Sequence, residues 1–317
     1  MIVSFGLDTL AATLAEIRVE RPFLVASERW SALAGGLPHV AWWTEVPSGR
    51  VEVPPEADGI LALGGGSAID TGKLASARSG LPLLSIPTTY SGAEWTTFYG
   101  IRTPDRRLQA GGTGALPAAI VYDVDLTLDL PRTDSGGTAL NALAHCAEAL
   151  YVRGRSAEGD EAALAGAAAI AQSLPVVLAD PDAREARELL LRGAADAGRA
   201  LSLAGLGLAH ALAQALGGAY GLSHGAMNAL CLPPALEFNR GLVPEPVAHF
   251  GRAIGADAVD GTRALARLAG FERLRDFGVP QGDLGRIAAV AAGRGGNLAN
   301  PRPATVEEIG ALLDSIW

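Results

Sequence analysis

The stretch Gly59-Ile-Leu-Ala-Leu-Gly-Gly-Gly-Ser-Ala-Ile-Asp70 decides the fold of the first third of the chain. Its first five residues form a short apolar run, which is typical of a strand buried on both faces. Three glycines follow directly, and a helical pattern then continues to about Ser79. A buried strand that runs through glycines into a helix is characteristic of the turns that hold phosphate groups in α/β proteins.

Further short apolar runs flank this unit and alternate with helical patterns. A short helix is expected from Glu28 to Ala34, and a loop rich in proline and acidic residues from Thr44 to Asp58. Besides Gly59–Leu63, strands are expected at Pro22–Ala26, Val40–Trp43, Pro82–Ile86 and Ala118–Tyr122. The alternation predicts an α/β domain with a doubly wound, mainly parallel sheet.

The sequence changes character after Pro131, where Ala- and Leu-rich helical periodicity replaces the short apolar runs. No strand is expected beyond this point. Helices are expected at 135–152, 158–179, 184–216, 222–236, 244–254, 260–270, 282–293 and 305–316. We therefore expect two domains, an α/β domain over residues 1–133 and an all-helical domain over residues 134–317.

The composition is that of a folded, acidic protein. Of the 317 residues, 49% are hydrophobic and 19% are charged, which excludes intrinsic disorder. The formal net charge of −9 argues against a nucleic acid or an anionic membrane surface as a partner, because both require a basic face. The two cysteines, Cys146 and Cys231, lie in apolar helical patterns, so we expect buried free thiols in a reducing cytoplasm.

Two charge-free stretches, Ala162–Ala179 and Ala200–Leu236, are long enough to be considered as membrane spans. The first contains Pro175, and the second is interrupted by several glycines, two histidines and two prolines. A helix that faces lipid does not carry so many polar groups and helix breakers. We expect buried helices of a soluble core, and no secretory signal in the first residues.

A second polar turn follows the strand Pro82–Ile86, in the stretch Pro87-Thr-Thr-Tyr-Ser-Gly-Ala-Glu94. Neighbouring parallel strands place their following turns at the same edge of a sheet, where doubly wound proteins bind ligands. The glycines and hydroxyls of the two turns therefore predict a nucleotide site, although a tight turn without a ligand is the alternative. The predicted cofactor-binding residues are Gly64, Gly65, Gly66, Ser67, Asp70, Thr88, Thr89 and Ser91.

Three of the five histidines form a pattern in the second half of the chain. Asn141 and His145 are four residues apart and so share one face of a helix, and His210 and Gln214 repeat this spacing. His224 follows a glycine-rich turn. Imidazoles brought together in this way can bind a metal or transfer protons, while the alternative is a set of core histidines with satisfied hydrogen bonds.

Taken together, these motifs resemble the iron-containing alcohol dehydrogenase family, which shares its fold with dehydroquinate synthase. Within it, the asparagine at position 141 and two further stretches look most similar to maleylacetate reductases: Tyr99-Gly100 and Asp123–Pro131. The motifs that carry the family resemblance are Gly64–Asp70, Pro87–Glu94, Asn141–His145, Gly207–His210, Ser223–Gly225 and Asn300–Pro303.

The resemblance implies a nicotinamide-binding domain, an all-helical domain and an active site in the cleft between them. It also implies that the positions of the family's metal ligands are Asn141, His145, His210 and His224. The family has aspartate where this chain has Asn141, and a neutral amide is a poor ligand for iron or zinc. Maleylacetate reductases share this change and are regarded as metal-independent.

The resemblance further implies an NAD(P)H-dependent oxidoreductase that transfers hydride to a small carboxylated carbonyl or enone compound, with catalytic residues His145, His210, His224 and Gln214. Most of the family has a histidine at position 214, and a glutamine there cannot act as an acid or base. An arginine is expected to bind the substrate carboxylate, and Lys73 is expected on the helix surface. The candidate arginines are Arg102, Arg106, Arg107 and Arg294.

Two other functions remain open from the sequence: a lyase- or cyclase-type enzyme of the same fold without net reduction, and a catalytically degenerate paralogue that only binds a ligand. NADH is favoured over NADPH, because Glu28 is the first charged residue after the first predicted strand. A homodimer in the cytoplasm is expected.

Overall fold

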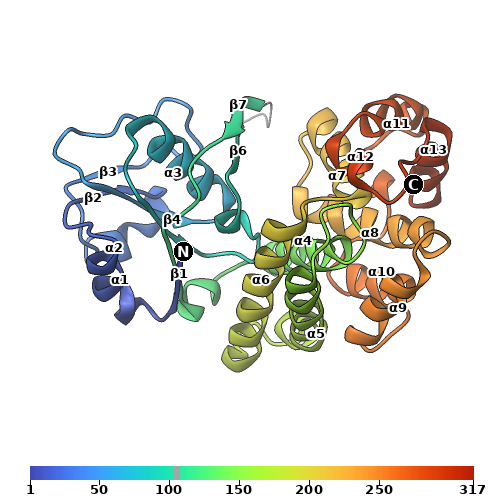
Figure 1. The fold of residues 1–317 in the computed structure, drawn as a ribbon, viewed down its shortest axis with the longest axis horizontal. Coiled ribbons are helices and arrows are strands. Elements are labelled where there is room, and N and C mark those ends of the chain that lie inside the picture. The colour runs from blue at the N-terminus through green and yellow to red at the C-terminus, as the bar shows by residue number, and fades with distance from the viewer. Residues whose placement is uncertain (103–107) are drawn as a thin grey trace. The chain divides into compact units, whose positions relative to one another are not determined.

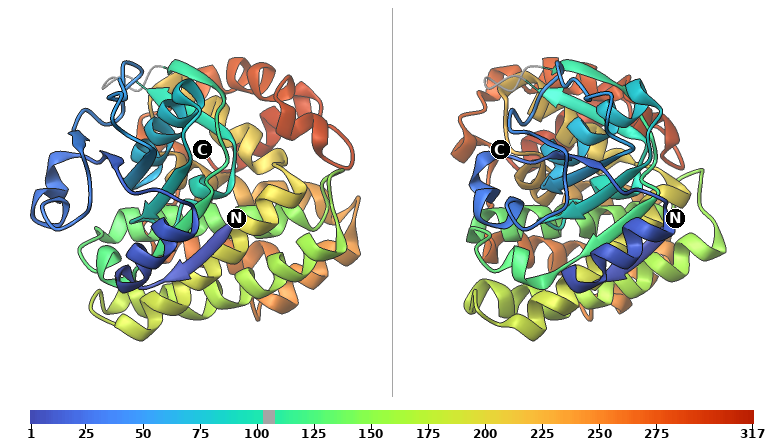
Figure 2. Two further views of the ribbon diagram at one scale, coloured as in Figure 1. Left: turned by 60° about the vertical axis from the view of Figure 1, so that its left-hand side comes forward. Right: turned by 90° about the vertical axis from the view of Figure 1, so that its left-hand side faces the viewer.

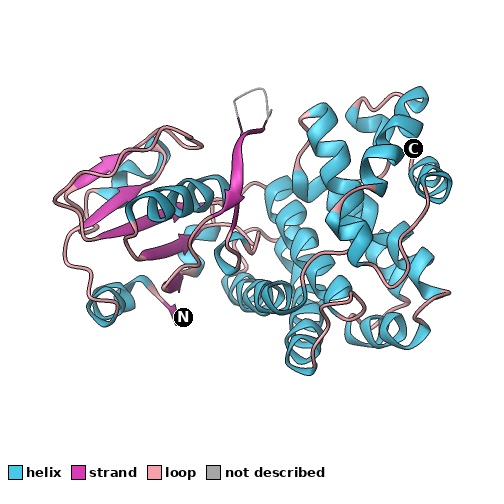
Figure 3. Ribbon diagram, turned by 45° about the horizontal axis from the view of Figure 1, so that its top comes forward, coloured by secondary structure: helices cyan, strands magenta, loops and turns pink. Residues whose placement is uncertain are grey.

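The computed structural model describes residues 1–102 and 108–317. The chain divides into two compact units, Met1–Leu130 and Pro131–Trp317 (Figure 1). All strands that the structure describes belong to the first unit, and the second is built from helices (Figure 3). The predicted fold class, a mainly parallel α/β domain followed by an all-helical domain, is confirmed.

A six-stranded sheet forms the centre of the first unit, in the order β1-β8-β5-β4-β2-β3, and every pair of neighbours is parallel. Its strands are β1 (Ile2–Phe5), β2 (Pro22–Val25), β3 (Ala41–Trp43), β4 (Gly59–Gly64), β5 (Leu83–Pro87) and β8 (Ala119–Tyr122). The pairing of β4 with β5 runs to Gly64 opposite Pro87. The two candidate turns therefore leave the sheet side by side.

Helices cover both faces of this sheet. The α-helices of the first unit are α1 (Leu10–Glu16), α2 (Ser31–Ala34) and α3 (Gly66–Ser79). Successive strand residues point to opposite faces, so Leu61 joins the apolar cluster that contains Leu14 of α1, whereas Ile60 joins the cluster that contains Leu74 of α3. This two-sided cover is the doubly wound arrangement that the sequence predicts.

Some elements of the first unit differ from the prediction. The helix expected from Glu28 to Ala34 is a 3-10 turn, Glu28–Trp30, followed by the short α2. The sequence does not predict β1, α1 or the antiparallel hairpin of β6 (Phe98–Arg102) and β7 (Leu108–Thr113). These strands give a weak signal, because β1 is a half-exposed edge strand and the hairpin mixes glycines with polar residues.

The second unit contains ten α-helices among the described residues. They are α4 (Arg132–Ala149), α5 (Ala157–Ala179), α6 (Arg184–Ala204), α7 (Leu208–Tyr220), α8 (His224–Arg240), α9 (Pro244–Ala253), α10 (Ala258–Leu268), α11 (Leu284–Ala292), α12 (Gly295–Ala299) and α13 (Val306–Ser315). Helix α4 packs against α5, α6 and α8, so most of its side chains are buried. Because a buried polar side chain needs a partner, the polar residues of α4 are candidates for a functional site.

The single helix expected at 184–216 is wrong. The structure has two helices there, α6 and α7, whose axes differ in direction by 99°. Gly205 ends α6 with φ of +92°, a conformation that favours glycine. The backbone N–H of Gly207 then donates to Oε2 of Glu148 at 2.7 Å, and a Cβ on Gly207 would lie 3.0 Å from this carboxylate group. The break thus places the start of α7 on a buried acid.

Helices α5 and α6 lie side by side (Figure 2). Gly166 and Gly193 allow this contact, because a Cβ on Gly166 would lie 2.9 Å from the carbonyl oxygen of Gly193. Helix α5 is long and apolar enough to cross a membrane, but half of its most apolar window is buried inside the structure. Core helices of soluble proteins meet the same criteria. Both cysteines are free and buried, and burial raises the pKa of both thiols.

Candidate active site

The two candidate turns of the first unit face each other. Gly64 ends β4 with φ of +145°, and its carbonyl oxygen accepts a hydrogen bond from the backbone N–H of Thr88 at 3.1 Å. A Cβ on Gly65 would lie only 3.1 Å from Cγ2 of Thr89. Glycine at this position therefore leaves bare backbone between the turns, as close approach of a ligand requires.

Hydrogen-bond donors gather at the same point. Helix α3 begins after Gly65 without a side-chain cap, so its first N–H groups have no partner within the helix and the positive end of its dipole is uncovered. Ser67 is exposed and does not cap the helix. The hydroxyls of Thr88 and Thr89 are buried without a hydrogen-bond partner among the described residues. These groups fit the pyrophosphate of a dinucleotide.

Ser91 and Asp70 complete the set of predicted cofactor-binding residues. Oγ of Ser91 lies 3.7 Å from the point where a Cβ on Gly66 would be, so Ser91 borders the glycine turn. Oδ2 of Asp70 accepts a hydrogen bond from the backbone N–H of Gly100 in β6 at 2.9 Å. Asp70 therefore joins α3 to the hairpin, and its contact with a cofactor stays a prediction.

Lys73 is not the helix-surface residue expected from the sequence. Its side chain is 0% exposed, and Nζ donates to the carbonyl oxygen of Phe98 at 2.7 Å and to Oγ1 of Thr96 at 3.1 Å. Burial lowers the pKa of this ammonium group, while the carboxylates of Asp70 and Glu94 act in the opposite direction. The expectation failed because the hairpin segment that covers this side of α3 has no clear signal in the sequence.

Three helices of the second unit bring the predicted histidines together. His145 lies on α4, His210 on α7, and His224 is the first residue of α8. The rings of His145 and His210 are stacked, with centroids 4.7 Å apart and an interplanar angle of 15°. The ring of His224 is tilted by 51° relative to that of His210, at a centroid distance of 5.6 Å. The three imidazoles thus form one histidine cluster.

Two asparagine amides connect the rings of the histidine cluster. Oδ1 of Asn141 accepts a hydrogen bond from Nδ2 of Asn228 at 2.6 Å and lies 3.2 Å from Nε2 of His210. Nδ2 of Asn141 lies 3.5 Å from Nε2 of His145. Nδ2 of Asn228 lies 3.1 Å from Nε2 of His224. Each imidazole is therefore positioned by an amide from α4 or α8.

Glu148 holds the other nitrogen of His210. Its carboxylate is 0% exposed, and Oε2 lies 2.6 Å from Nδ1 of His210. The same carboxylate accepts hydrogen bonds from the backbone N–H groups of Gly207, at 2.7 Å, and His210, at 3.2 Å. A carboxylate at this ring nitrogen fixes the orientation and the tautomer of an imidazole. It also compensates the positive end of the α7 dipole.

The histidine cluster has a buried side and an exposed side. His145 is 3% exposed and His210 is 1% exposed, whereas His224 is exposed. Burial lowers the pKa of His145 well below its ordinary value, and the neighbouring rings of His210 and His224 lower it further. His145 is therefore neutral at pH 7, and its buried Nδ1 has no hydrogen-bond partner among the described residues.

Gln214 lies one turn after His210 on α7 and is half-buried. Its Oε1 accepts a hydrogen bond from Nη1 of Arg294 at 3.4 Å. Arg294 is thus the one predicted carboxylate-binding arginine that the structure connects to a predicted catalytic residue. The side chains of the other three candidates lie outside the described part of the chain: Arg102, Arg106 and Arg107.

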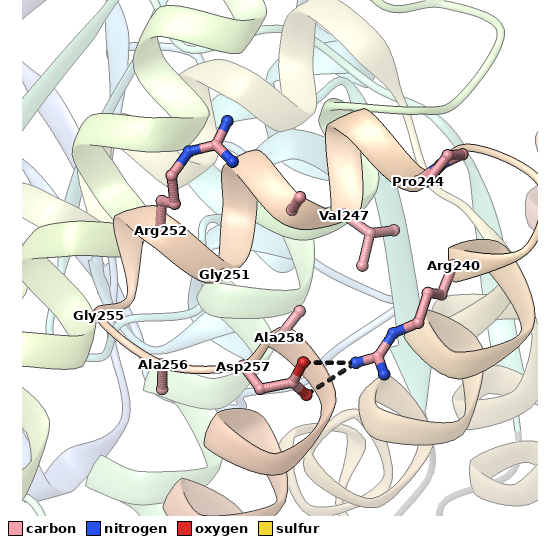
Figure 4. Close-up of a pocket in the computed structure, with 10 residues that line it drawn as sticks. Arg240, Pro244, Val247, Gly251, Arg252, Gly255, Ala256, Asp257 and Ala258 are labelled. Carbon is pink, nitrogen blue, oxygen red and sulfur yellow. Dashed lines mark hydrogen bonds and ion pairs between the residues drawn. The ribbon is translucent and has the colours of Figure 1, made fainter.

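A separate pocket of about 630 Å³ lies among α8, α9 and α10. Nη2 of Arg240, which lines this pocket, donates to both carboxylate oxygens of Asp257, at 2.7 and 2.8 Å (Figure 4). Val247 and Ala258 contribute apolar surface. None of the residues predicted to act on a cofactor or substrate lines this pocket.

Two models of known protein families together match most of both units. The model described as "Fe-containing alcohol dehydrogenase family, C-terminal" matches residues 136–317, and the model "Iron-containing alcohol dehydrogenase" matches residues 53–124. The chain belongs to the iron-containing alcohol dehydrogenase family. It is accordingly an NAD(P)-dependent oxidoreductase, and its cofactor is a nicotinamide dinucleotide.

Several relatives in this family are maleylacetate reductases. Maleylacetate reductase 1 of Rhodococcus opacus is 36% identical over 264 residues, which cover 83% of this chain and 73% of that protein. The enzyme of Sphingobium indicum is 36% identical over 260 residues, which cover 81% of this chain and 73% of that protein. The crystal structure of maleylacetate reductase from Rhizobium sp. strain MTP-10005 matches with a TM-score of 0.89 at 30% identity, covering 100% of this chain and 95% of that chain.

The family name implies a metal, but the side chains at the ligand positions, as they are arranged, do not fit a divalent ion. Asn141 offers a neutral amide, and the N–H groups of Asn228 lie among the acceptor atoms. Within residues 1–102 and 108–317, no three His, Cys, Asp or Glu side chains are placed to hold a metal ion.

Sequence reasoning missed Glu148 and Asn228, although the spacing contains a signal for both. Glu148 follows His145 by three residues, and Asn228 follows His224 by four, so each shares a helix face with a histidine. A charged or polar residue in an apolar helix needs a partner, and a nearby histidine is a natural one. The partner that Glu148 uses, His210, lies on a different helix and has no signal in local spacing.

Proposed function

We propose that the chain reduces a small carboxylated carbonyl or conjugated enone compound of the maleylacetate type, with NADH as the reductant. The observation that carries this proposal is the stack of His145 and His210, held by Glu148, in a chain similar to proteins named maleylacetate reductases. Buried, oriented N–H groups stabilise an oxygen on which negative charge develops. The cluster therefore suits the acceptor side of a hydride transfer.

The first unit is proposed to hold the dinucleotide. The N–H groups at the start of α3 and the hydroxyls of Thr88 and Thr89 would bind the pyrophosphate. NADH is proposed over NADPH because Glu28 is the first charged residue after β2. Arg29, which follows it, stacks on the ring of Trp30 at 4.6 Å. An arginine at this position could bind the 2′-phosphate of NADPH, but the guanidinium of Arg29 packs on the indole ring instead, which supports the choice of NADH.

The reduced nicotinamide, when bound, would supply one hydride, which is equivalent to one proton and two electrons. The substrate would gain a C–H bond at its electrophilic carbon, and the reduced cofactor would lose one. One proton from solvent completes the product, so one NADH and one proton are consumed for each substrate reduced. His145, His210 and His224 are proposed to orient the reacting oxygen of the substrate through hydrogen bonds, with Glu148 holding His210 in place. Gln214 is proposed to donate a hydrogen bond to another oxygen of the substrate.

The test is the stoichiometry of turnover. The purified protein is incubated with NADH and maleylacetate, and the loss of near-ultraviolet absorbance is compared with the substrate consumed. One NADH oxidised per substrate supports the proposal. Product formation without NADH oxidation supports lyase- or cyclase-type chemistry instead. Absence of NADH and NADPH binding in calorimetry supports a degenerate, ligand-binding paralogue.

A further inference from the structure

Arg294 occupies a fixed position next to α7, the helix that carries His210 and Gln214. It precedes α12, whose Gly296 packs so closely on the start of α7 that a Cβ there would lie 2.3 Å from the carbonyl oxygen of Gly207. The buried side chain of Asn297 holds the same turn through hydrogen bonds to the carbonyl oxygens of Ala292 and Ala304. The guanidinium of Arg294 is therefore carried by a rigid turn anchored on the helix that carries His210.

The guanidinium lies along α7. Nη1 donates to Oε1 of Gln214 at 3.4 Å, and Nη2 lies 3.5 Å from the point where a Cβ on Gly218 would be. Gly218 is exposed, and its missing side chain makes room for the guanidinium. Gln214 is one helical turn, or about 6 Å along the axis, from His210. Arg294 and Gln214 are half-buried, and His224 is exposed.

The chemistry of this pair suits an anion. Arginine stays protonated at any physiological pH and presents N–H groups in a planar fork that matches a carboxylate. Gln214 uses its oxygen towards Arg294, so its own N–H groups point away from the guanidinium. Glutamine cannot move a proton, whereas it can supply a further hydrogen bond to a bound oxygen.

We propose that Arg294 and Gln214 form the subsite that binds a carboxylate of the substrate and so makes the enzyme specific for short oxo acids. The inference rests on the proposed reduction for its context and adds the residues that select the substrate. A spacing of one helical turn between this subsite and His210 fits a carboxylate a few bonds from the reacting carbonyl. Arg294 fixes the position of the substrate and takes no part in the hydride transfer itself.

The first experiment measures binding without turnover. Maleate, a small dicarboxylate that is not reduced, is titrated calorimetrically into the enzyme saturated with NADH. Arg294→Gln is expected to weaken maleate binding by at least roughly tenfold, as expected for loss of a two-pronged ionic contact. Gln214→Glu, which places a carboxylate beside Arg294, is expected to abolish maleate binding. Arg286→Gln is the matched control, because it removes an exposed arginine of the neighbouring α11 that pairs with Asp283.

The second experiment separates specificity from catalysis. With maleylacetate, Arg294→Gln is expected to raise KM at least roughly tenfold and to change kcat by less than about threefold. With an uncharged ester of the same compound, Arg294→Gln is expected to lower kcat/KM much less than it does with the acid. Arg294→Lys keeps the charge without the fork, and an intermediate KM is expected.

The outcomes distinguish the subsite from the proposed reduction. Equal maleate affinity in wild type and Arg294→Gln, or equal losses for acid and ester, overturns the subsite while leaving reduction intact. No reduction of any carbonyl compound, together with maleate binding that depends on Arg294, overturns the proposed reaction and supports the carboxylate subsite. Unchanged melting temperatures show that these variants are folded.

Discussion

Nδ1 of His210 lies 2.6 Å from Oε2 of Glu148, and the two side chains are 1% and 0% exposed. The carboxylate that receives this contact also accepts the backbone N–H of Gly207. One buried acid therefore fixes both the start of α7 and the ring that this helix carries. Since the ring of His210 stacks on that of His145, the position of Glu148 determines the geometry of the histidine cluster.

Glu148→Gln is expected to lower kcat at least roughly tenfold, which corresponds to about 1.4 kcal/mol of activation free energy. The amide keeps the shape of the carboxylate, but it removes the charged acceptor at Nδ1 of His210. Loss of that charge-assisted hydrogen bond is expected to lower the free energy of unfolding by about 1.5–3 kcal/mol. Steady-state kinetics and urea denaturation measure the two effects.

Glu188→Gln is the control, because Glu188 forms an exposed ion pair with Arg192 on α6. Such pairs contribute about 0–1 kcal/mol, so neither kcat nor stability is expected to change appreciably. Wild-type kcat in Glu148→Gln would show that the orientation of His210 does not matter for turnover.

Asn141→Asp is expected to create a metal site. The substitution replaces a neutral amide by a carboxylate next to His145 and His210, and carboxylates are favourable ligands for zinc and iron. After incubation with Zn²⁺ and dialysis, elemental analysis is expected to find near one equivalent in the variant and a small fraction of this in the wild type. A full equivalent in the wild type would contradict the statement that the present side chains do not fit a divalent ion.

Gly65→Val is expected to weaken binding of NADH at least roughly tenfold. Its tight contact with Thr89 is also expected to lower the free energy of unfolding by about 1–3 kcal/mol. The valine would fill the space between the turns, because even its Cβ would lie 3.1 Å from Thr89. Fluorescence titration with NADH measures the affinity. Gly36→Val is the control, since the nearest atom to its Cβ position is a backbone oxygen at 3.6 Å. Unchanged NADH affinity in Gly65→Val would remove the glycine turn from the cofactor site.

The parts of the fold that the sequence predicts are those with strong local patterns. The strands β2, β4, β5 and β8 are fully buried apolar runs, and their predicted positions are confirmed to within one residue. The break between α6 and α7 is missed because the charge-free pattern continues through it. Gly205 and Gly207 alone do not show that the backbone N–H at the start of α7 donates to the carboxylate of Glu148, which is distant in sequence.

The candidate site is predictable to a similar extent. Helical spacing indicates which residues share a face, and so it finds Asn141 with His145 and His210 with Gln214. It gives no information on contacts between helices, such as the hydrogen bond from Arg294 to Gln214 across 80 residues of sequence. The burial of Lys73 likewise depends on a hairpin that pairs only in three dimensions.

Glu94 is expected to make stability depend on pH. Its carboxyl group is 1% exposed, and burial raises its pKa, although a hydrogen bond from Tyr122 opposes this. The folded state therefore holds this proton more tightly than the unfolded state does. The stabilisation is complete below the ordinary pKa of 4.5 and is lost as the pH rises through the higher pKa of the folded state.

Glu94→Gln removes this ionisation and keeps an oxygen for the Tyr122 hydroxyl, which donates to Oε1 at 2.6 Å. The stability of the variant relative to wild type is expected to rise between pH 5 and pH 8, because only the wild type loses stability as Glu94 ionises. Urea denaturation at both pH values measures the difference, with Glu188→Gln as the surface control. A difference that does not change with pH would show that Glu94 keeps an ordinary pKa.

The most direct test of the account is a single turnover of the enzyme preloaded with NADH and mixed rapidly with maleylacetate, in wild type and in His210→Ala. The wild type is expected to oxidise one equivalent of NADH, and the variant is expected to do so at least roughly tenfold more slowly, or about 1.4 kcal/mol in activation free energy, with nearly the same affinity for NADH. An equal rate of NADH oxidation in the two proteins would contradict a role for the histidine cluster in hydride transfer.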